Sequence, residues 1–226
     1  RISGTLMDLT ERKRVEQMKN DFVSTVSHEL RTPLTSISGA LGLIVGGALG
    51  SAPPTMQQML EIAYRNSLRL GHLINDLLDM EKIAAGKMSF ELREHSLGDL
   101  LEESRASNQA LCEQHGVRCT LEHPTDVLVW VDGLRLQQVL GNFLSNAVKF
   151  TPEGGEIRLH SSLRGTKVRI SVTDQGPGIP EAFRSRVFEK FAQADASDSR
   201  QKSGTGLGLA ITKELIERMG GTVGFD

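Results

Sequence analysis

The sequence predicts an α+β protein in which a long antiparallel helical hairpin precedes an α/β sandwich domain. Apolar residues recur at steps of three and four through the first third of the chain, which indicates long amphipathic helices. After Gly86 the pattern changes to short strand-like segments that alternate with helices. We therefore expect a hairpin over 15–86 and a second domain over 87–226, with 1–14 as a separate segment before the hairpin.

The composition is that of an ordinary globular protein, with 38% hydrophobic and 24% charged residues. A net charge of −2 gives no general attraction to nucleic acid or membranes, and no apolar run is long enough to span a bilayer. We expect neither a nucleic-acid partner nor membrane contact for this segment. Cys112 and Cys119 lack metal-ligand spacing, which favours plain thiols in a reducing, cytoplasmic compartment. A longer protein could still carry a membrane anchor upstream.

Two helices are expected in the first part, Thr10–Gly46 and Thr55–Ala85, joined by a glycine- and proline-rich turn. Pro33 lies inside the first helix and predicts a bend there. The second helix carries a heptad-like seam. A lone hairpin cannot bury both apolar stripes, so we predict a two-fold homodimer that forms a four-helix bundle. The alternative is that both helices pack on the rest of the same chain.

The second part predicts a mixed sheet with helices over one face. Strands are expected at 87–91, 118–122, 127–131, 156–163 and 167–174, with a further strand beginning at 221–225. Helices are expected at 97–114, 133–150 and 206–219.

Three polar sites occur in this second part. Asn142, Asn146 and Lys149 share one helix stripe, where amide oxygens and an ammonium group could bind hydrated Mg²⁺ and phosphates. A solvated helix face is the alternative. Asp174 ends a strand and precedes Gly176-Pro177-Gly178, so its carboxylate could accept a hydrogen bond from a purine amine; a simple turn would look the same.

The third site is the glycine loop Ser203–Ala210, which opens a helix whose free N–H groups suit anionic phosphates. It matches neither the Rossmann nor the Walker spacing. The preceding polar segment, 188–202, could be a lid over bound nucleotide, with Arg200 or Lys202 near the terminal phosphate. A disordered surface loop is compatible with the same composition.

His28 lies beside the apolar stripe of the first helix, between Ser27 and Glu29, with Thr32 one turn further on. Alone it could be a surface residue or a nucleophile held on a rigid rod. A zinc-protease helix would need a second histidine at position 32, and adjacent side chains on one helix cannot form a hydrolase triad.

In this order the motifs resemble the sensor histidine kinases of two-component signalling. Ser27–Leu34 resembles their H box and Asn142–Pro152 their N box. The G1, F and G2 boxes are similar to 174–178, 188–191 and 204–208. The resemblance implies a dimeric helical hairpin followed by an ATP-binding domain of the gyrase/Hsp90-like type. Residues 6–14 resemble the end of a PAS sensor domain, which implies that 1–14 are the end of an upstream PAS-like module and the start of a signalling helix.

The resemblance also implies residue roles. His28 would be the phosphoacceptor, Glu29 its base or orienting group, and Thr32 the residue that positions water in a phosphatase reaction. Asn146 would bind Mg²⁺, and Asp174 would recognise the adenine of ATP. The remaining nucleotide contacts would be Asn142, Lys149, Phe150, Gly176, Gly178, Ile179, Arg200, Lys202, Gly204, Thr205, Gly206, Leu207 and Gly208.

The activity implied is ATP- and Mg²⁺-dependent autophosphorylation of His28, followed by transfer to an aspartate of a response-regulator receiver domain. A non-catalytic dimeric scaffold that binds nucleotide is the alternative. Family members continue past Val223 with further strands, so one or more C-terminal strands are expected to be missing after Asp226.

Overall fold

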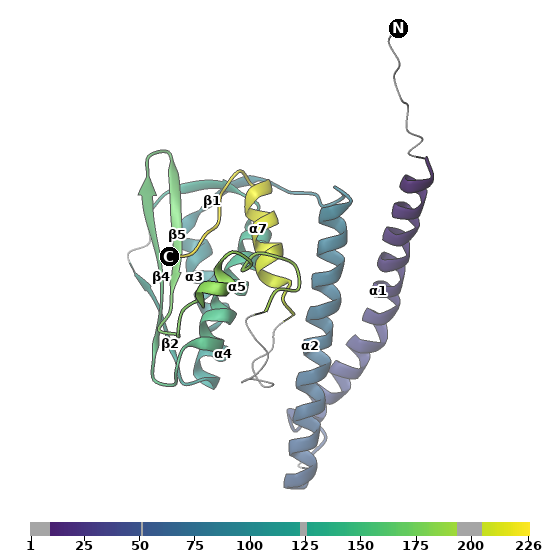
Figure 1. The fold of residues 1–226 in the computed structure, drawn as a ribbon. Helices are drawn as coiled ribbons and strands as arrows, with labels where there is room; N and C mark the ends of the chain where they lie inside the picture. Colours follow the sequence, from purple (N-terminus) through teal and green to yellow (C-terminus); the bar gives the residue numbers. More distant parts are fainter. Residues whose placement is uncertain (1–9, 51, 123–125, 194–204) are drawn as a thin grey trace. The chain divides into compact units, whose positions relative to one another are not determined.

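The chain divides into two compact units, Arg1–Met88 and Ser89–Asp226. The structure is a computed structural model that describes residues 10–50, 52–122, 126–193 and 205–226 (Figure 1). No helix in these described ranges is long and apolar enough to cross a bilayer. The predicted start of the hairpin domain at residue 15 stays a prediction.

The first unit is the expected helical hairpin. α1 spans Thr10–Val45 and α2 spans Pro54–Ala84. Gly47 and Gly50 adopt positive φ angles of 76° and 94° in the turn, a conformation that side chains disfavour. α1 continues as helix through Pro33, and the bend at that residue stays a prediction.

Only a small apolar cluster, Leu34, Ile74 and Leu78, is buried between the described parts of the two helices. Polar contacts complete their packing, among them a hydrogen bond from Arg31 Nη2 to Asn75 Oδ1 (2.8 Å) and one from Ser38 Oγ to Ser67 Oγ (2.9 Å). Much of the predicted apolar seam is exposed instead. The exposed residues include Val26, Leu30, Ile37, Met59, Ile62, Leu70 and Leu77. The hairpin therefore presents an apolar stripe to its surroundings.

The second unit begins with a two-stranded ribbon. β1 (Arg93–Ser96) pairs antiparallel with β3 (Leu128–Val131). The strand predicted at 87–91 is therefore wrong in position, because β1 starts two residues beyond that range. At Glu91 the backbone N–H makes no ladder hydrogen bond and instead donates to the side chain of Asp132, at Oδ2 (2.9 Å).

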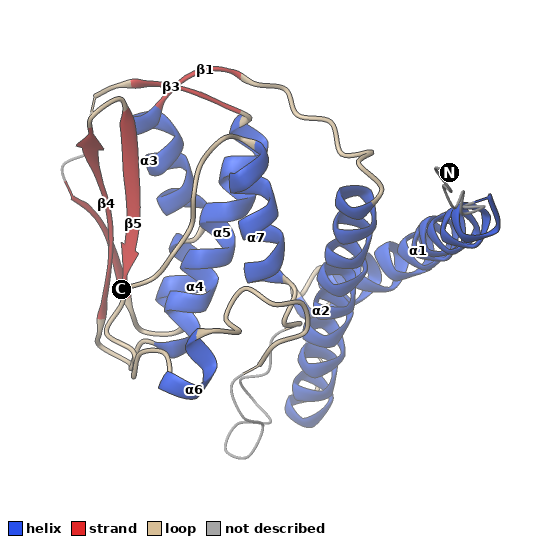
Figure 2. Cartoon of the chain, turned by 45° about the horizontal axis from the view of Figure 1, so that its top comes forward, coloured by secondary structure: helices blue, strands red, loops and turns tan. Residues whose placement is uncertain are grey.

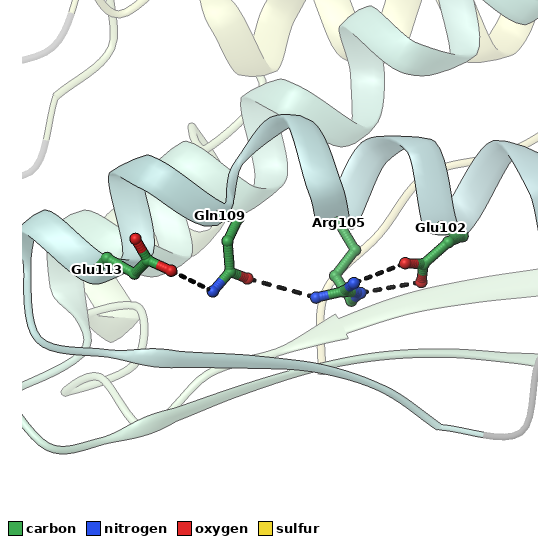
Figure 3. A network of polar contacts seen from close by, with 4 residues as sticks. All are labelled: Glu102, Arg105, Gln109 and Glu113. Carbon is green, nitrogen blue, oxygen red and sulfur yellow. Dashed lines mark hydrogen bonds and ion pairs between the residues drawn. The ribbon is translucent and has the colours of Figure 1, made fainter.

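The helix predicted over 97–114 is two helices, α3 (Leu97–Ser107) and α4 (Gln109–Gln114). Asn108 interrupts them with φ −99° and ψ 0°, and its side chain caps the Ser104 carbonyl at 2.8 Å. Figure 3 shows a polar chain that crosses this break on the outside, from Glu102 through Arg105 and Gln109 to Glu113. The hydrogen bond from Arg105 lowers the pKa of Glu102 below its usual value.

The main sheet has the order β2-β4-β5, where β2 is Arg118–Glu122, β4 is Glu156–Arg164 and β5 is Lys167–Thr173. β2 and β4 are parallel, whereas β4 and β5 form the predicted antiparallel hairpin. α5 (Gly133–Phe150) and α7 (Gly208–Arg218) lie with α3 along one side of this sheet (Figure 2). The short α6 (Glu181–Arg184) has no counterpart in the sequence prediction.

The core of the second unit lies between these helices and the sheet. Ile157 and Leu159 on β4 are fully buried against the apolar faces of the helices. The α/β sandwich with a mixed sheet is thus confirmed. The strand expected at 221–225 is wrong, since these residues form no ladder pairs with the described strands.

Both cysteines belong to this core. Cys112 and Cys119 are free and buried, and both belong to one apolar cluster. Burial raises the pKa of the Cys112 thiol and raises that of Cys119 to about 11. The expectation of plain thiols is consistent with this setting, because neither thiolate is stabilised at neutral pH.

Asp132 anchors the start of α5, and its removal is expected to destabilise the second unit. Its buried carboxylate accepts from the N–H of Arg135 (3.1 Å) as an N-cap and from the N–H of Glu91 (2.9 Å). Asp132→Ala would leave both donors unpaired and should lower the free energy of unfolding by about 2–3 kcal/mol. Thermal unfolding followed by fluorescence of the single tryptophan, Trp130, would measure this loss.

Asp126→Ala is the matched control, because Asp126 is exposed. If both variants unfolded at the same temperature as the parent, the Asp132 carboxylate would not hold the start of α5 in place.

Candidate functional site

His28 stands exposed on α1, as a phosphoacceptor would have to be. Its neighbour Ser27 is only 2% exposed, so the chain turns one side chain inward and the next outward. Glu29 is exposed as well, and no hydrogen bond joins these two side chains where the structure describes them. The Thr32 hydroxyl donates to the His28 carbonyl at 3.5 Å. The imidazole is therefore reachable from solvent.

A groove of about 450 Å³ runs between α1 and α2, starting within one helical turn of His28. Its walls combine apolar, small and polar groups. They include Arg31, Leu34, Ser38, Tyr64, Gly71 and His72. No motif in the sequence indicated this groove, because its walls come from two helices that are distant along the chain.

Asn142, Asn146 and Lys149 follow one another at helical spacing on α5. The opposite face of α5 is buried, with Leu140 and Leu144 at 2% and 0% exposure, so the stripe faces away from the core. The Asn142 side-chain amide donates to the Gly208 carbonyl (3.2 Å) and to the Thr212 hydroxyl oxygen (3.3 Å). Asn142 thus joins α5 to the first turn of α7.

Asn146 differs from Asn142 because its amide makes no hydrogen bond to another described residue, although it is only half-exposed. Lys149 lies one turn further along, with Nζ 4.7 Å from the centroid of the Phe150 ring. An amide oxygen and an ammonium group therefore belong to the same stripe. The amide oxygen of Asn146 is the kind of group that binds a cation, and the ammonium group of Lys149 is the kind that binds an anion.

Asp174 follows β5, and its carboxylate is partly committed. Its Oδ1 accepts from the Gly176 N–H at 2.7 Å, which fixes the carboxylate and leaves Oδ2 for another donor. A Cβ on Gly176 would stand 3.2 Å from both the carbonyl oxygen and Cβ of Phe150. The turn after β5 therefore touches the end of α5. Gly178 has a φ of 75°, and the Ile179 carbonyl accepts from Arg184 Nε at 3.3 Å.

The glycine loop meets the segment that carries Phe191. Gly206 (φ 71°) accepts a hydrogen bond from the Phe191 N–H at 2.9 Å, and Phe191 itself has a φ of 61°. The Thr205 hydroxyl accepts from the Leu207 N–H at 3.0 Å. No described side chain caps the N-terminus of α7, so the amides of its first turn are available to an anion. Arg200, Lys202 and Gly204 lie outside the described residues.

Two contacts within the second unit connect these elements. α5 contacts the first turn of α7 through Asn142 and the Asp174 turn through Phe150, so it links elements that carry a carboxylate, side-chain amides, an ammonium group and helix N–H groups. Such a set fits a purine nucleotide, with the carboxylate for its amine and the helix amides for its phosphates. His28 belongs to the first unit. Sequence reasoning missed Thr212, although its position four residues after Gly208 places it on the same side of α7.

Gly206→Ala is expected to disrupt the loop. The new Cβ would stand 2.9 Å from two backbone atoms of Phe191, which no side-chain rotation can relieve. We expect at least a tenfold loss of ATP affinity, corresponding to about 1–3 kcal/mol of strain. Titration with a fluorescent ATP analogue would measure it.

Gly220→Ala is the matched control, since Gly220 has a similar φ of 78° but no atom within 4 Å of the position that a Cβ would take. Equal affinity in both variants and the parent would show that the contact with Phe191 does not shape the site.

Comparison with known proteins identifies both units. Residues 18–86 match the His Kinase A (phospho-acceptor) domain, and residues 131–226 match the histidine kinase-, DNA gyrase B- and HSP90-like ATPase family. The chain is 40% identical over 233 residues to the signal transduction histidine-protein kinase BarA of Escherichia coli K12, covering 99% of this chain and 25% of BarA. It is 37% identical to the sensor histidine kinase TmoS of Ectopseudomonas mendocina, covering 96% of this chain and 22% of TmoS.

Solved structures agree. Full-length ShkA in complex with AMPPNP matches with a TM-score of 0.69 and 31% identity, over 88% of this chain and 41% of ShkA. The catalytic domain of the histidine kinase ThkA matches with a TM-score of 0.50 and 33% identity, over 57% of this chain and 82% of that domain. ThkA in complex with the response regulator TrrA matches with a TM-score of 0.57 and 26% identity, over 96% of this chain and 62% of ThkA.

The chain thus spans about a quarter of the length of the two curated relatives. Over that span it has both units of their family, the phospho-acceptor hairpin and the ATPase-family α/β domain. On this evidence the chain belongs to the sensor histidine kinases.

Proposed function

We propose that this chain is the kinase core of a sensor histidine kinase that transfers the γ-phosphoryl group of ATP to His28. The observation that carries the proposal is the solvent exposure of His28 on a long helix, in a chain whose second unit joins Asn142 to α7 and holds the Asp174 carboxylate after β5. The further proposed step is transfer of that phosphoryl group to an aspartate of a response-regulator receiver domain.

The nucleotide would bind along α5 and the start of α7. Asp174 Oδ2 accepts a hydrogen bond from the exocyclic amine of adenine, while Oδ1 stays bonded to Gly176. The amides of the glycine loop and the Lys149 ammonium group stabilise the phosphates. The side-chain amide oxygen of Asn146 is the proposed ligand for Mg²⁺, which would neutralise phosphate charge when bound. Described residues contain no cluster of three or more His, Cys, Asp or Glu side chains suited to a metal, so phosphates and water would complete its shell.

The transfer itself requires neutral imidazole. A ring nitrogen of His28 forms a bond to the γ-phosphorus as the bond from that phosphorus to the bridging oxygen breaks, and ADP leaves. The proton on the other ring nitrogen is held by Glu29, which orients the ring and stabilises the positive charge that develops on it. Thr32 is proposed to position water when the phosphoryl group is hydrolysed in a phosphatase reaction.

Two interaction surfaces accompany this chemistry. The exposed stripe of Leu30, Ile37, Met59, Ile62 and Leu70 fits a second copy of the hairpin, which would form the four-helix bundle. The groove beside His28 fits a helix of the receiver domain, because a phosphoacceptor aspartate must come within bonding distance of the ring. An upstream PAS-like module and a cytoplasmic location complete the proposal.

A labelling experiment separates this proposal from a nucleotide-binding scaffold without transfer activity. The purified chain is incubated with γ-labelled ATP and Mg²⁺, and the label is then tested for lability in acid, since phosphohistidine hydrolyses in acid. Acid-labile label that passes to an added receiver domain supports the kinase. Tight ATP binding without any label on the protein would favour the scaffold.

A further inference from the structure

Two buried hydroxyl groups lack a hydrogen-bond partner among the described residues, those of Ser104 and Thr151. Ser104 is 1% exposed and lies within α3, whereas Thr151 is 7% exposed and follows directly after α5. An unpaired buried hydroxyl is destabilising, and native proteins seldom keep one without a reason. The position of Thr151 relative to the nucleotide-type site supplies such a reason.

Thr151 is held next to the turn that carries Asp174. Its N–H donates to the Ala147 carbonyl at 2.9 Å, which fixes its backbone as the cap of α5. The carbonyl of the preceding residue, Phe150, lies 3.2 Å from the point where a Gly176 Cβ would stand. Asp174 Oδ1 lies 2.7 Å from that same point. The residue directly before Thr151, Phe150, is therefore the one that contacts the Asp174 turn.

The other side of Thr151 faces a second turn. Its methyl carbon would be 2.5 Å from a Cβ on Gly155, and Gln175 Oε1 would be 3.1 Å from the same atom. Gln175 Oε1 also accepts from the Glu156 N–H at 2.9 Å. Since the methyl group faces Gly155, the hydroxyl occupies another side of the Thr151 Cβ. Neither turn provides it with a partner.

We propose that the Thr151 hydroxyl is a specificity-determining group of the nucleotide site that donates to a ring nitrogen beside the purine amine, directly or through one water molecule. The inference rests on the proposed function and adds to Asp174 a second polar contact with the base. The hydroxyl oxygen is covered by protein in the structure, so the contact forms as the turn around Gly176 and Gly178 adjusts to the base. A purine without that nitrogen would leave the hydroxyl unpaired and would bind more weakly.

The test compares Thr151→Val, which keeps the shape and removes the hydroxyl, with Thr151→Ser, which keeps the hydroxyl. Ser104→Ala is the matched control, because it removes the other unpaired hydroxyl at a place remote in sequence from every candidate site residue. Calorimetric titration of the whole chain measures the affinity for ATP, 1-deaza-ATP and 7-deaza-ATP. Thermal unfolding without nucleotide is recorded for each variant.

We expect Thr151→Val to bind ATP about five- to tenfold more weakly, while Thr151→Ser and Ser104→Ala bind like the parent. The difference in affinity between the parent and Thr151→Val should disappear with one of the two deaza analogues, because that analogue lacks the ring nitrogen that accepts from the hydroxyl. Without nucleotide, Thr151→Val should unfold at the same or a higher temperature than the parent, since no hydrogen bond is lost. A purely structural hydroxyl would instead lower that temperature.

Unchanged ATP affinity in Thr151→Val, or an equal loss for ATP and both analogues, would overturn the inference. A parent chain that binds no ATP would overturn the proposed function instead, so the two failures are distinguishable.

Discussion

His28→Gln is expected to abolish acid-labile labelling of the chain by γ-labelled ATP. Glutamine has the length to preserve the packing of α1, but its amide nitrogen is not nucleophilic at neutral pH. His28 is exposed, so the substitution removes no buried contact and should leave the unfolding temperature unchanged. The label on the parent and on the variant would be quantified after acid and alkaline treatment.

His160→Gln is the control, since His160 lies on β4 and is not among the candidate site residues. Equal acid-labile label on parent and His28→Gln would remove His28 from its proposed role. An ATP affinity that is unchanged in His28→Gln would show that the loss arises at the transfer step, because the proposed nucleotide site belongs to the other unit.

Asn146→Ala is expected to lower the autophosphorylation rate by at least about 100-fold, more than the roughly 10–100-fold that loss of an outer-shell metal partner costs. Asn146 makes no hydrogen bond to another described residue, so the substitution should change the free energy of unfolding little. The lower labelling rate should therefore arise from weaker Mg²⁺-dependent nucleotide binding. Initial labelling rates over a range of Mg²⁺ concentrations would measure the effect. An unchanged rate at every concentration would discredit the metal assignment.

Asn142→Ala provides the contrast on the same stripe. Asn142 donates two hydrogen bonds to α7, so its loss should lower the free energy of unfolding by about 1–3 kcal/mol as well as the labelling rate. Extra Mg²⁺ should partly restore activity to Asn146→Ala but not to Asn142→Ala. Mixing Asn146→Ala with His28→Gln adds a further result: a labelling rate of the mixture well above that of either variant alone would show transfer between protomers.

Much of the fold followed from periodicity, and the departures have local causes. α5 and β2 begin and end where the sequence placed them, because each has a clear apolar pattern and a cap or turn at its ends. The helix predicted over 97–114 breaks at Asn108, whose side chain bonds to the helix backbone in place of continuing it. Apolar spacing alone does not reveal that competition. β1 starts later than predicted because its pairing with β3 selects the register.

The candidate site was predictable in its residues but not in its connections. The stripe of Asn142 and Asn146 followed from helical spacing, yet nothing in that spacing indicated that one amide is bound to α7 while the other makes no hydrogen bond to a described residue. The positive φ of Phe191 and its close approach to Gly206 depend on how two distant loops meet.

The order of residues along the chain specifies the chemical groups and the elements that carry them: a histidine on a long amphipathic helix, a carboxylate at a strand end and a glycine loop at a helix start. Which of these groups form hydrogen bonds within the protein, and which remain available, depends on the fold. This is because local pattern sets the direction of a side chain, whereas its hydrogen-bond partners come from residues far away in the chain. Thr151 is the sharpest case, because only the packing of two turns around it leaves its hydroxyl without a partner among the described residues.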